Sequence, residues 1–162
     1  MVRHAIAAER DSSRWPDDSE RPLTRQGEER MRKAARGLQV IVPEVDVLLS
    51  SPYVRAWRTA EILREEIGWA EPRLWPELEP DRPAAETVRS LGPFAEANRV
   101  ALVGHDPNLS EVASYLLVGE GGPGVKIVLK KAGVVCLGVD GAPGPASAWL
   151  TWFATPRMLR QM

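Results

Sequence analysis

The sequence lacks several features that would assign it to a particular class of protein. It contains one cysteine, Cys136, which excludes an intramolecular disulfide. It has no charged leader before an apolar run and no apolar span of membrane-crossing length, so we expect a cytoplasmic protein without a membrane partner. Its 21 basic and 22 acidic residues leave a formal net charge of -1, which is too small to attract nucleic acid. Any anion that the protein binds must therefore be held by a local cluster of donors.

Histidine is scarce as well, because the 162 residues include only His4 and His105. Two histidines without a nearby cluster of cysteines or carboxylates are a poor ligand set for zinc, and we expect neither a metal nor another cofactor. The chain has a usual length for one domain and is long enough to bury a sizeable core. We therefore expect residues 1–162 to form a single domain.

The first half of the chain predicts two helices separated by a strand. Thr24 fits the N-cap of a helix whose apolar residues recur at helical spacing. Those apolar residues are Met31, Ala34, Ala35 and Leu38. Residues 45–49 form a compact apolar run that suits a buried parallel strand. Ser51 and Pro52 fit the N-cap and the first position of the next helix, expected over 53–67.

The second half continues the alternation. A helix is expected over 84–97, with a break or kink at Gly92-Pro93. Asn108 and Glu111 are spaced as a capping box, which predicts a helix over 109–117. Strands are expected at 99–103, within 126–139 and at 148–153, the last two as antiparallel partners. Loops are expected at 9–20, 74–81 and 119–124.

This order of elements predicts an α/β fold, a three-layer α/β/α sandwich with a mostly parallel central sheet and an antiparallel edge strand. In a parallel sheet the carboxyl ends of the strands share one edge, where ligands bind. Arg3, His4 and His105 follow two strands directly, and Arg55 lies in the helix after a third. Two arginines, two histidines and a helix N-terminus could together receive a doubly charged oxyanion such as phosphate.

Each of these residues also has an ordinary structural explanation. His105 could be a core histidine bonded to a backbone carbonyl. Arg55 could be an exposed helix arginine paired with Asp11 or Glu61. If the residues do form one site, an imidazole there could attack phosphorus through a neutral ring nitrogen, or donate a hydrogen bond to the phosphate oxygens.

Three segments together resemble the signature segments of the histidine phosphatase superfamily, in the same order. They are Arg3-His4-Ala5, Ser50-Ser-Pro-Tyr-Val-Arg-Ala-Trp-Arg-Thr-Ala60 and Val103-Gly-His-Asp-Pro-Asn-Leu-Ser110. Arg21-Pro-Leu-Thr-Arg-Gln-Gly27 and Trp149-Leu-Thr-Trp-Phe-Ala-Thr-Pro156 further resemble the SixA-like branch, the phosphohistidine phosphatases. The resemblance spans nearly the whole chain and implies a phosphoglycerate mutase-like fold.

The resemblance also implies a mechanism. His4 would be the nucleophile that takes up the phosphoryl group, and Arg3, Arg55 and His105 would complete the phosphate pocket, before water releases phosphate. The substrate implied for the SixA-like branch is phosphohistidine on a protein partner. The alternatives are a phosphatase for a small metabolite ester, a mutase, which so short a chain makes less favourable, and a non-catalytic phosphate-binding module.

The sequence departs from the family pattern in two places. Only Met1 and Val2 precede Arg3 where the family has a longer apolar strand, so we expect a short first strand or an upstream start. The second departure is the leaving-group acid, for which Glu77 is the best candidate and a solvated loop carboxylate the alternative. SixA-like members tend to lack this acid, and an imidazole leaving group needs less proton help than an alkoxide.

Overall fold

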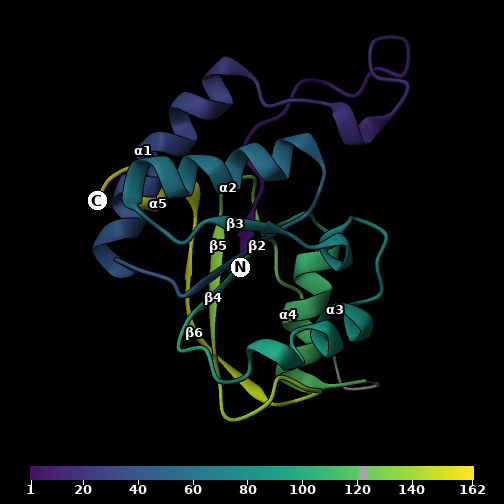
Figure 1. Cartoon of the computed structure of the whole chain (residues 1–162), viewed down its shortest axis with the longest axis vertical. Coiled ribbons are helices and arrows are strands. Elements are labelled where there is room, and N and C mark those ends of the chain that lie inside the picture. The colour runs from purple at the N-terminus through teal and green to yellow at the C-terminus, as the bar shows by residue number, and fades with distance from the viewer. Residues whose placement is uncertain (121–123) are drawn as a thin grey trace.

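Six strands form one sheet in the computed structural model, which describes residues 1–120 and 124–162 (Figure 1). They are β1 (Val2–Arg3), β2 (Val47–Ser50), β3 (Pro72–Leu74), β4 (Val100–Gly104), β5 (Val134–Val139) and β6 (Ala148–Ala154). Their spatial order is β3-β2-β4-β1-β5-β6. The pairs β3–β2, β2–β4 and β4–β1 are parallel, whereas β1–β5 and β5–β6 are antiparallel. This confirms the expected mostly parallel sheet, with its antiparallel pairings gathered at one edge.

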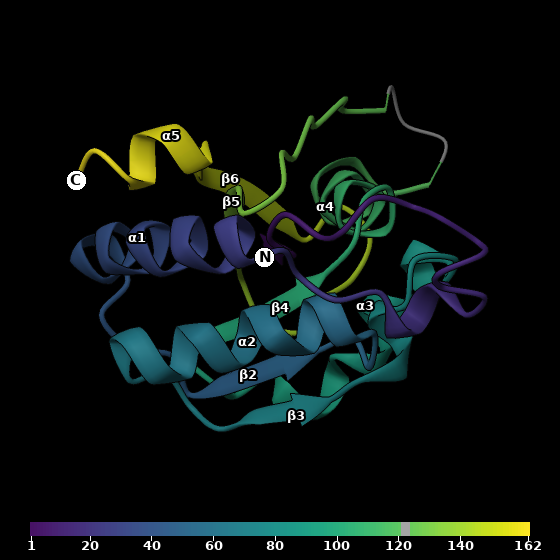
Figure 2. The same cartoon turned by 90° about the horizontal axis from the view of Figure 1, so that it is seen from above.

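Helices cover both faces of the sheet. The α-helices are α1 (Arg25–Ile41), α2 (Val54–Ile67), α3 (Ala84–Ser90), α4 (Asn108–Val118) and α5 (Pro156–Leu159). Short 3-10 helices are η1 (Asp18–Glu20), η2 (Pro76–Leu78) and η3 (Gly92–Phe94). Figure 2 shows α1 and α2 on one side of the sheet and α4 on the other, next to α3. The three-layer α/β/α sandwich is therefore confirmed.

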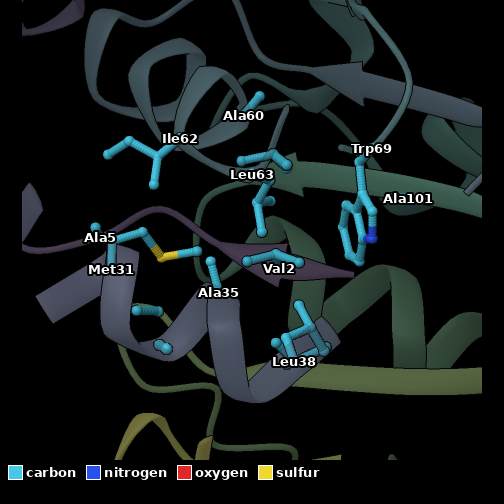
Figure 3. Close-up of a cluster of buried hydrophobic side chains, with 14 of the residues drawn as sticks. Val2, Ala5, Met31, Ala35, Leu38, Ala60, Ile62, Leu63, Trp69 and Ala101 are labelled. Atoms are coloured by element: carbon cyan, nitrogen blue, oxygen red, sulfur yellow. The ribbon is translucent and has the colours of Figure 1, made fainter. Parts of the chain in front are cut away.

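The two layers of core follow from the alternation of side chains along the strands. Leu48 packs with the cluster under α1 and α2, whereas Val47 and Leu49 pack with the cluster under α3 and α4. Figure 3 shows the first cluster, in which Leu38 of α1 lies below Val2 and Met31 of the same helix lies beside it. The apolar spacing that predicted α1 thus serves to fill this layer.

The starts of the helices agree with the sequence only in part. Thr24 caps α1 as predicted, because its hydroxyl accepts a hydrogen bond from the backbone of Gly27 at 2.9 Å. The predicted cap of α2 was wrong: Tyr53 is its N-cap and Val54 its first residue. The backbone N–H of Ser51 donates to the carbonyl of Val103, so Ser51 still belongs to the edge of the sheet.

The predicted capping box at Asn108 was also wrong. Asn108 is itself the first residue of α4, and its side chain makes no cap. The side-chain amide instead donates to the Arg82 carbonyl at 2.9 Å and to the Thr87 hydroxyl at 3.3 Å. Because Asn108 is fully buried against α3, it holds two helices together rather than starting one.

Several segments were assigned correctly only in outline. The expected break at Gly92-Pro93 separates α3 from η3. The loop predicted over 74–81 contains η2, and before it the unpredicted β3 begins at Pro72, which an edge strand tolerates. Of the loop predicted over 119–124, residues 121–123 lie outside the described part of the chain. Within the described ranges, no helix has the length and apolarity needed to cross a membrane.

Candidate active site

The two histidines meet at the carboxyl edge of the sheet. His4 follows β1 and His105 follows β4, and these strands are parallel neighbours in which Arg3 pairs with Gly104. The two imidazole rings are 5.1 Å apart between centroids. The positive charges of Arg55 and Arg3 both act on His4. The structure therefore brings together the four residues that the strand ends predicted.

The imidazole of His4 is held in one tautomer. Its Nδ1 lies 2.7 Å from the carbonyl oxygen of Ala5, and since a carbonyl can only accept, Nδ1 must carry the proton. The ring is 5% exposed, and this burial, with the nearby arginines, lowers the pKa of His4 to about 3. At neutral pH the ring is uncharged, and its Nε2 has a free lone pair, as a nucleophile requires.

His105 is also buried and neutral. Its Nε2 shares a hydrogen bond of 2.9 Å with the hydroxyl of Ser51, which also accepts from the backbone N–H of Tyr53. The ring of Tyr53 meets that of His105 edge-on, 5.0 Å away. Burial, followed by the charges of His4 and Arg55, lowers the pKa of His105 to about 2. Ser51 and Tyr53 are thus the residues that orient this imidazole.

Arg55 is not the exposed helix arginine that its sequence position allowed. It is 3% exposed and pairs with Asp18 rather than with Asp11 or Glu61. Its Nη1 donates to the Asp18 carbonyl at 2.6 Å and its Nη2 to the Asp18 carboxylate at 2.9 Å. The face of the guanidinium lies 4.9 Å from the ring centroid of Tyr53. Both outer nitrogens of the Arg55 guanidinium are therefore fixed, and so is the orientation of its Nε–H.

Asp18 is the residue of this site that the sequence did not predict. It lies in the polar segment interpreted only as a loop, and η1 presents it to Arg55. A second arginine, Arg21, donates to it through Nε at 2.8 Å. Partial burial alone would raise the pKa of Asp18, but the bond from Arg21 and the charge of Arg55 lower it to about 2. The acid-rich composition of the loop was the only signal, and it did not single out Asp18.

Arg3 is also anchored by the surrounding protein. Its Nη1 donates to the backbone carbonyl of Leu129 at 2.6 Å and lies 3.7 Å from the carboxylate of Asp106. The carboxylate of Asp106 is itself bonded by the hydroxyl of Ser110. The segment before β5, through the carbonyl of Leu129, therefore fixes this second guanidinium.

Three buried donors or acceptors of these side chains have no protein partner in the described ranges. They are Arg3 Nε, Arg55 Nε and His105 Nδ1. Leaving a buried donor unpaired costs roughly 1–3 kcal/mol, so such groups are usually satisfied by a ligand or water. Arg55 has both outer nitrogens bonded to Asp18, Arg3 has its Nη1 bonded to the Leu129 carbonyl, and the Nε of each has no partner in the described ranges, which suits a group with several acceptor oxygens. Donors placed in this way could hold an oxyanion beside the His4 nitrogen that has a free lone pair.

Glu77 lies in η2, and its backbone carbonyl accepts a hydrogen bond from the Thr87 hydroxyl. Two other carboxylates of the same loop, Glu79 and Asp81, act on Tyr53, whose pKa is raised first by burial and then by their charges. Among the residues the structure describes, no group of three or more His, Cys, Asp or Glu side chains could hold a metal ion.

Comparisons with known proteins give relatives for both the sequence and the fold. The model of the histidine phosphatase superfamily (branch 1) matches residues 1–80. An uncharacterized protein of Picosynechococcus sp. is 35% identical over 139 residues, which are 85% of this chain and 82% of that protein. The protein histidine phosphatase SixA, solved with tungstate, superposes with a TM-score of 0.81 at 23% identity, over 96% of this chain and 95% of its own. A phosphoserine phosphatase mutant of Entamoeba histolytica, solved with phosphoserine, gives a TM-score of 0.72 at 14% identity, over 98% and 96%.

Proposed function

The chain belongs to the histidine phosphatase superfamily and is a phosphatase, and from this we propose that it removes phosphate from phosphohistidine on a protein partner, with His4 as nucleophile. The observation that carries the proposal is the state of His4. The Nδ1–H of His4 donates a hydrogen bond to the Ala5 carbonyl, and the pKa of the imidazole is lowered to about 3. Nε2 can therefore attack phosphorus without first losing a proton. We also propose that residues 1–162 act as a single catalytic domain.

The proposed reaction has two displacements at phosphorus. In the first, the Nε2 lone pair of His4 forms a P–N bond while the bond to the leaving group breaks and its electron pair goes with that group. The imidazole leaves as a neutral ring, because its other nitrogen already carries a proton and the freed nitrogen keeps the electron pair of the broken P–N bond. In the second, water attacks the phosphorus of the phosphorylated His4, the P–N bond breaks, and phosphate departs with the water oxygen.

The cationic side chains stabilise both steps. Arg3 and Arg55 each have a buried Nε–H without an acceptor in the described part of the protein. These donors, with the buried imidazole of His105, would bond the oxygens that carry charge in the transition state. Because the guanidinium groups are held in advance by Asp18 and by the Leu129 carbonyl, little reorganisation is needed as the reaction proceeds.

The lack of an obvious leaving-group acid supports phosphohistidine as the substrate. An imidazole can leave as a neutral ring whose second nitrogen is already protonated, whereas an alkoxide needs a proton in the transition state. Glu77, the best sequence candidate, accepts a hydrogen bond from Thr87 through its backbone carbonyl. A phosphoramidate is therefore the substrate class that the described side chains serve best.

A small phosphate ester is the second candidate, because Glu79 and Asp81 are close enough for their charges to act on Tyr53 beside His105. One of these carboxylates could protonate an alkoxide leaving group. The two functions differ in what they require of the acids, and this difference defines the test.

The experiment compares hydrolysis of a phosphohistidine protein with hydrolysis of a panel of phosphomonoesters. We expect the wild type to be a poor esterase and Glu77→Gln, Glu79→Gln and Asp81→Asn to leave phosphohistidine turnover nearly unchanged. Loss of a general acid would lower ester hydrolysis by roughly 10²- to 10⁴-fold. A vigorous wild-type esterase that loses activity selectively in one of these variants would establish the metabolite phosphatase instead.

A further inference from the structure

A buried hydroxyl of α2 touches the main chain beside His4 and the main chain of Arg55. It belongs to Thr59, which is fully buried in the second turn of the helix. The hydroxyl oxygen lies 3.0 Å from the backbone nitrogen of Ala5 and 2.7 Å from the carbonyl oxygen of Arg55. Because a carbonyl can only accept, the one hydroxyl proton must go to Arg55, and the oxygen accepts the backbone N–H of Ala5. Both hydrogen bonds therefore have a fixed direction.

Only one of these two hydrogen bonds is a usual feature of a helix. A threonine within a helix often donates to the carbonyl four residues before it, as Thr59 does to Arg55. The hydrogen bond from Ala5 instead joins residues that are 54 apart in the sequence. It connects α2 with the segment after β1, although β2, the strand that leads into α2, is separated from β1 by β4. The contact with Ala5 is therefore the one that needs a further explanation.

Ala5 is the residue on which the chemical state of His4 depends. Its carbonyl oxygen lies 2.7 Å from Nδ1 of His4, and its backbone N–H is the group that Thr59 holds. The main chain of His4 is also held, because its N–H donates to the Gly104 carbonyl at 2.9 Å and its carbonyl accepts from Ala132 at 3.1 Å. If Ala5 moved, its carbonyl would leave Nδ1, and the proton could settle on Nε2. A protonated Nε2 has no lone pair with which to attack phosphorus.

We propose that Thr59 is a positioning residue for the proposed reaction, because its hydroxyl holds Ala5 in place and thereby keeps Nε2 of His4 unprotonated. The inference rests on the proposed function and adds a residue that acts through Ala5 without touching the substrate. The side chain of Arg55 is held separately by Asp18. Loss of the Thr59 hydroxyl should therefore lower kcat and change KM little.

Thr59→Val replaces the hydroxyl with a methyl group and leaves the buried N–H of Ala5 without its acceptor. The same turn is also held by the backbone N–H of Thr24, which donates to the Ile6 carbonyl at 3.0 Å, so we expect the variant to fold. With a phosphohistidine peptide as substrate, kcat should fall roughly 10- to 100-fold, the loss typical when a group that orients a metal-bound histidine is removed. Thr59→Ser keeps the hydroxyl and should restore kcat to nearly the wild-type value.

The tautomer of His4 provides a readout that needs no substrate. His4 is one of only two histidines in the chain, so labelling histidine with ¹⁵N gives two imidazole rings, which His105→Asn assigns. The ¹⁵N chemical shifts separate a protonated ring nitrogen from one with a lone pair. In the wild type and in Thr59→Ser we expect His4 to be protonated at Nδ1 only. In Thr59→Val a second population, protonated at Nε2, should appear.

Thr87→Val is the matched control, because Thr87 is another fully buried threonine in a helix. Its hydroxyl donates to the Glu77 carbonyl at 2.7 Å and lies 3.3 Å from the side-chain nitrogen of Asn108. This substitution also removes a buried hydroxyl and should lower stability, but kcat for the peptide and the tautomer of His4 should stay as in the wild type. Thr59→Cys, whose thiol is a weak donor and acceptor, repeats the test with a polar side chain should Thr59→Val fail to fold.

The role of Thr59 is overturned if removal of its hydroxyl leaves both kcat and the tautomer of His4 unchanged. It is also overturned if Thr59→Ser is as slow as Thr59→Val, or if Thr87→Val loses as much kcat. A wild type that hydrolyses esters but no phosphohistidine peptide would overturn the proposed function instead. The two failures are distinguishable, because the spectra of His4 are recorded without substrate.

Discussion

His4 is the residue whose chemical state decides the proposed reaction. His4→Ala removes the attacking nitrogen but leaves Arg3, Arg55 and His105 to bind the anion. Turnover should be abolished, while the affinity for phosphate stays within roughly tenfold, about 1.4 kcal/mol. Steady-state kinetics and phosphate titration measure the two quantities separately. Arg55→Ala should weaken both together, because a guanidinium facing the transferred group acts on binding and on chemistry. Substantial activity in His4→Ala would exclude covalent catalysis through His4.

Asp18 offers a second test at the residue scale, because it orients Arg55 through two hydrogen bonds without being part of the proposed chemistry. Asp18→Asn keeps the backbone contact and removes the charged one. Hydrogen bonds to charged groups contribute about 1.5–3 kcal/mol, so kcat/KM should fall by roughly 10- to 100-fold.

Asp17→Asn is the control for that substitution. Asp17 is the exposed neighbour of Asp18. Its carboxylate accepts a hydrogen bond from the backbone N–H of Ser19, whereas that of Asp18 accepts from Arg55. Its substitution should leave kcat/KM nearly unchanged. Equal losses in the two variants, or a loss in Asp18→Asn that matches its loss of thermal stability, would show that the loop rather than the carboxylate is required.

At the scale of elements, the packing of α1 on α5 depends on a glycine. Gly37 is buried in α1, and a Cβ there would overlap the carbonyl oxygen of Leu159 in α5. Gly37→Ala should therefore destabilise the protein by about 1–3 kcal/mol, the usual cost of overpacking, although alanine is the better helix former by about 1 kcal/mol. Urea unfolding measures the change.

The matched control is Gly92→Ala in η3. A Cβ at Gly92 would meet no heavy atom within 4 Å, and the stability of this variant should change little. If Gly37→Ala were as stable as the wild type, the close contact between α1 and α5 would not hold the C-terminal helix in place.

At the scale of the whole molecule, the buried histidines make stability depend on pH. Their pKa values are lowered from 6.5 to about 3 for His4 and about 2 for His105. Between pH 6.5 and about 3 the unfolded chain therefore binds protons that the folded protein does not. The free energy of unfolding must fall as the pH drops through this window, by up to about 1.4 kcal/mol per pH unit for each histidine.

Urea unfolding at pH 7, 6 and 5 in phosphate-free buffer measures this slope. His105→Asn should show a smaller slope than the wild type over the same range, because one of the two titrating groups is gone. The comparison of slopes does not depend on how stable the variant is at neutral pH. Equal slopes would mean that His105 is as easily protonated in the folded protein as in the unfolded chain.

Local patterns in the chain were enough to predict most of the elements, although not β3, and the edge of the sheet on which the candidate site lies. Apolar spacing depends on near neighbours in the chain, so α1 and its Thr24 cap could be predicted from the residues themselves. Because parallel strands end at a common edge, the residues that follow β1 and β4 were expected at the same edge of the sheet. The order of the strands, in which β1 lies directly beside β4, then places His4 next to His105.

How those residues are held depends on the tertiary structure. Arg55 could have paired with any of 22 acidic residues, and the path of a loop 37 residues away selects Asp18. The contact of Ser51 with His105 spans 54 residues, and it accompanies the later start of α2 that the local signals did not predict. The tautomer of His4 depends on the hydrogen bond to the backbone carbonyl of Ala5. These contacts depend on where loops travel in space, and no local periodicity in a sequence records that path.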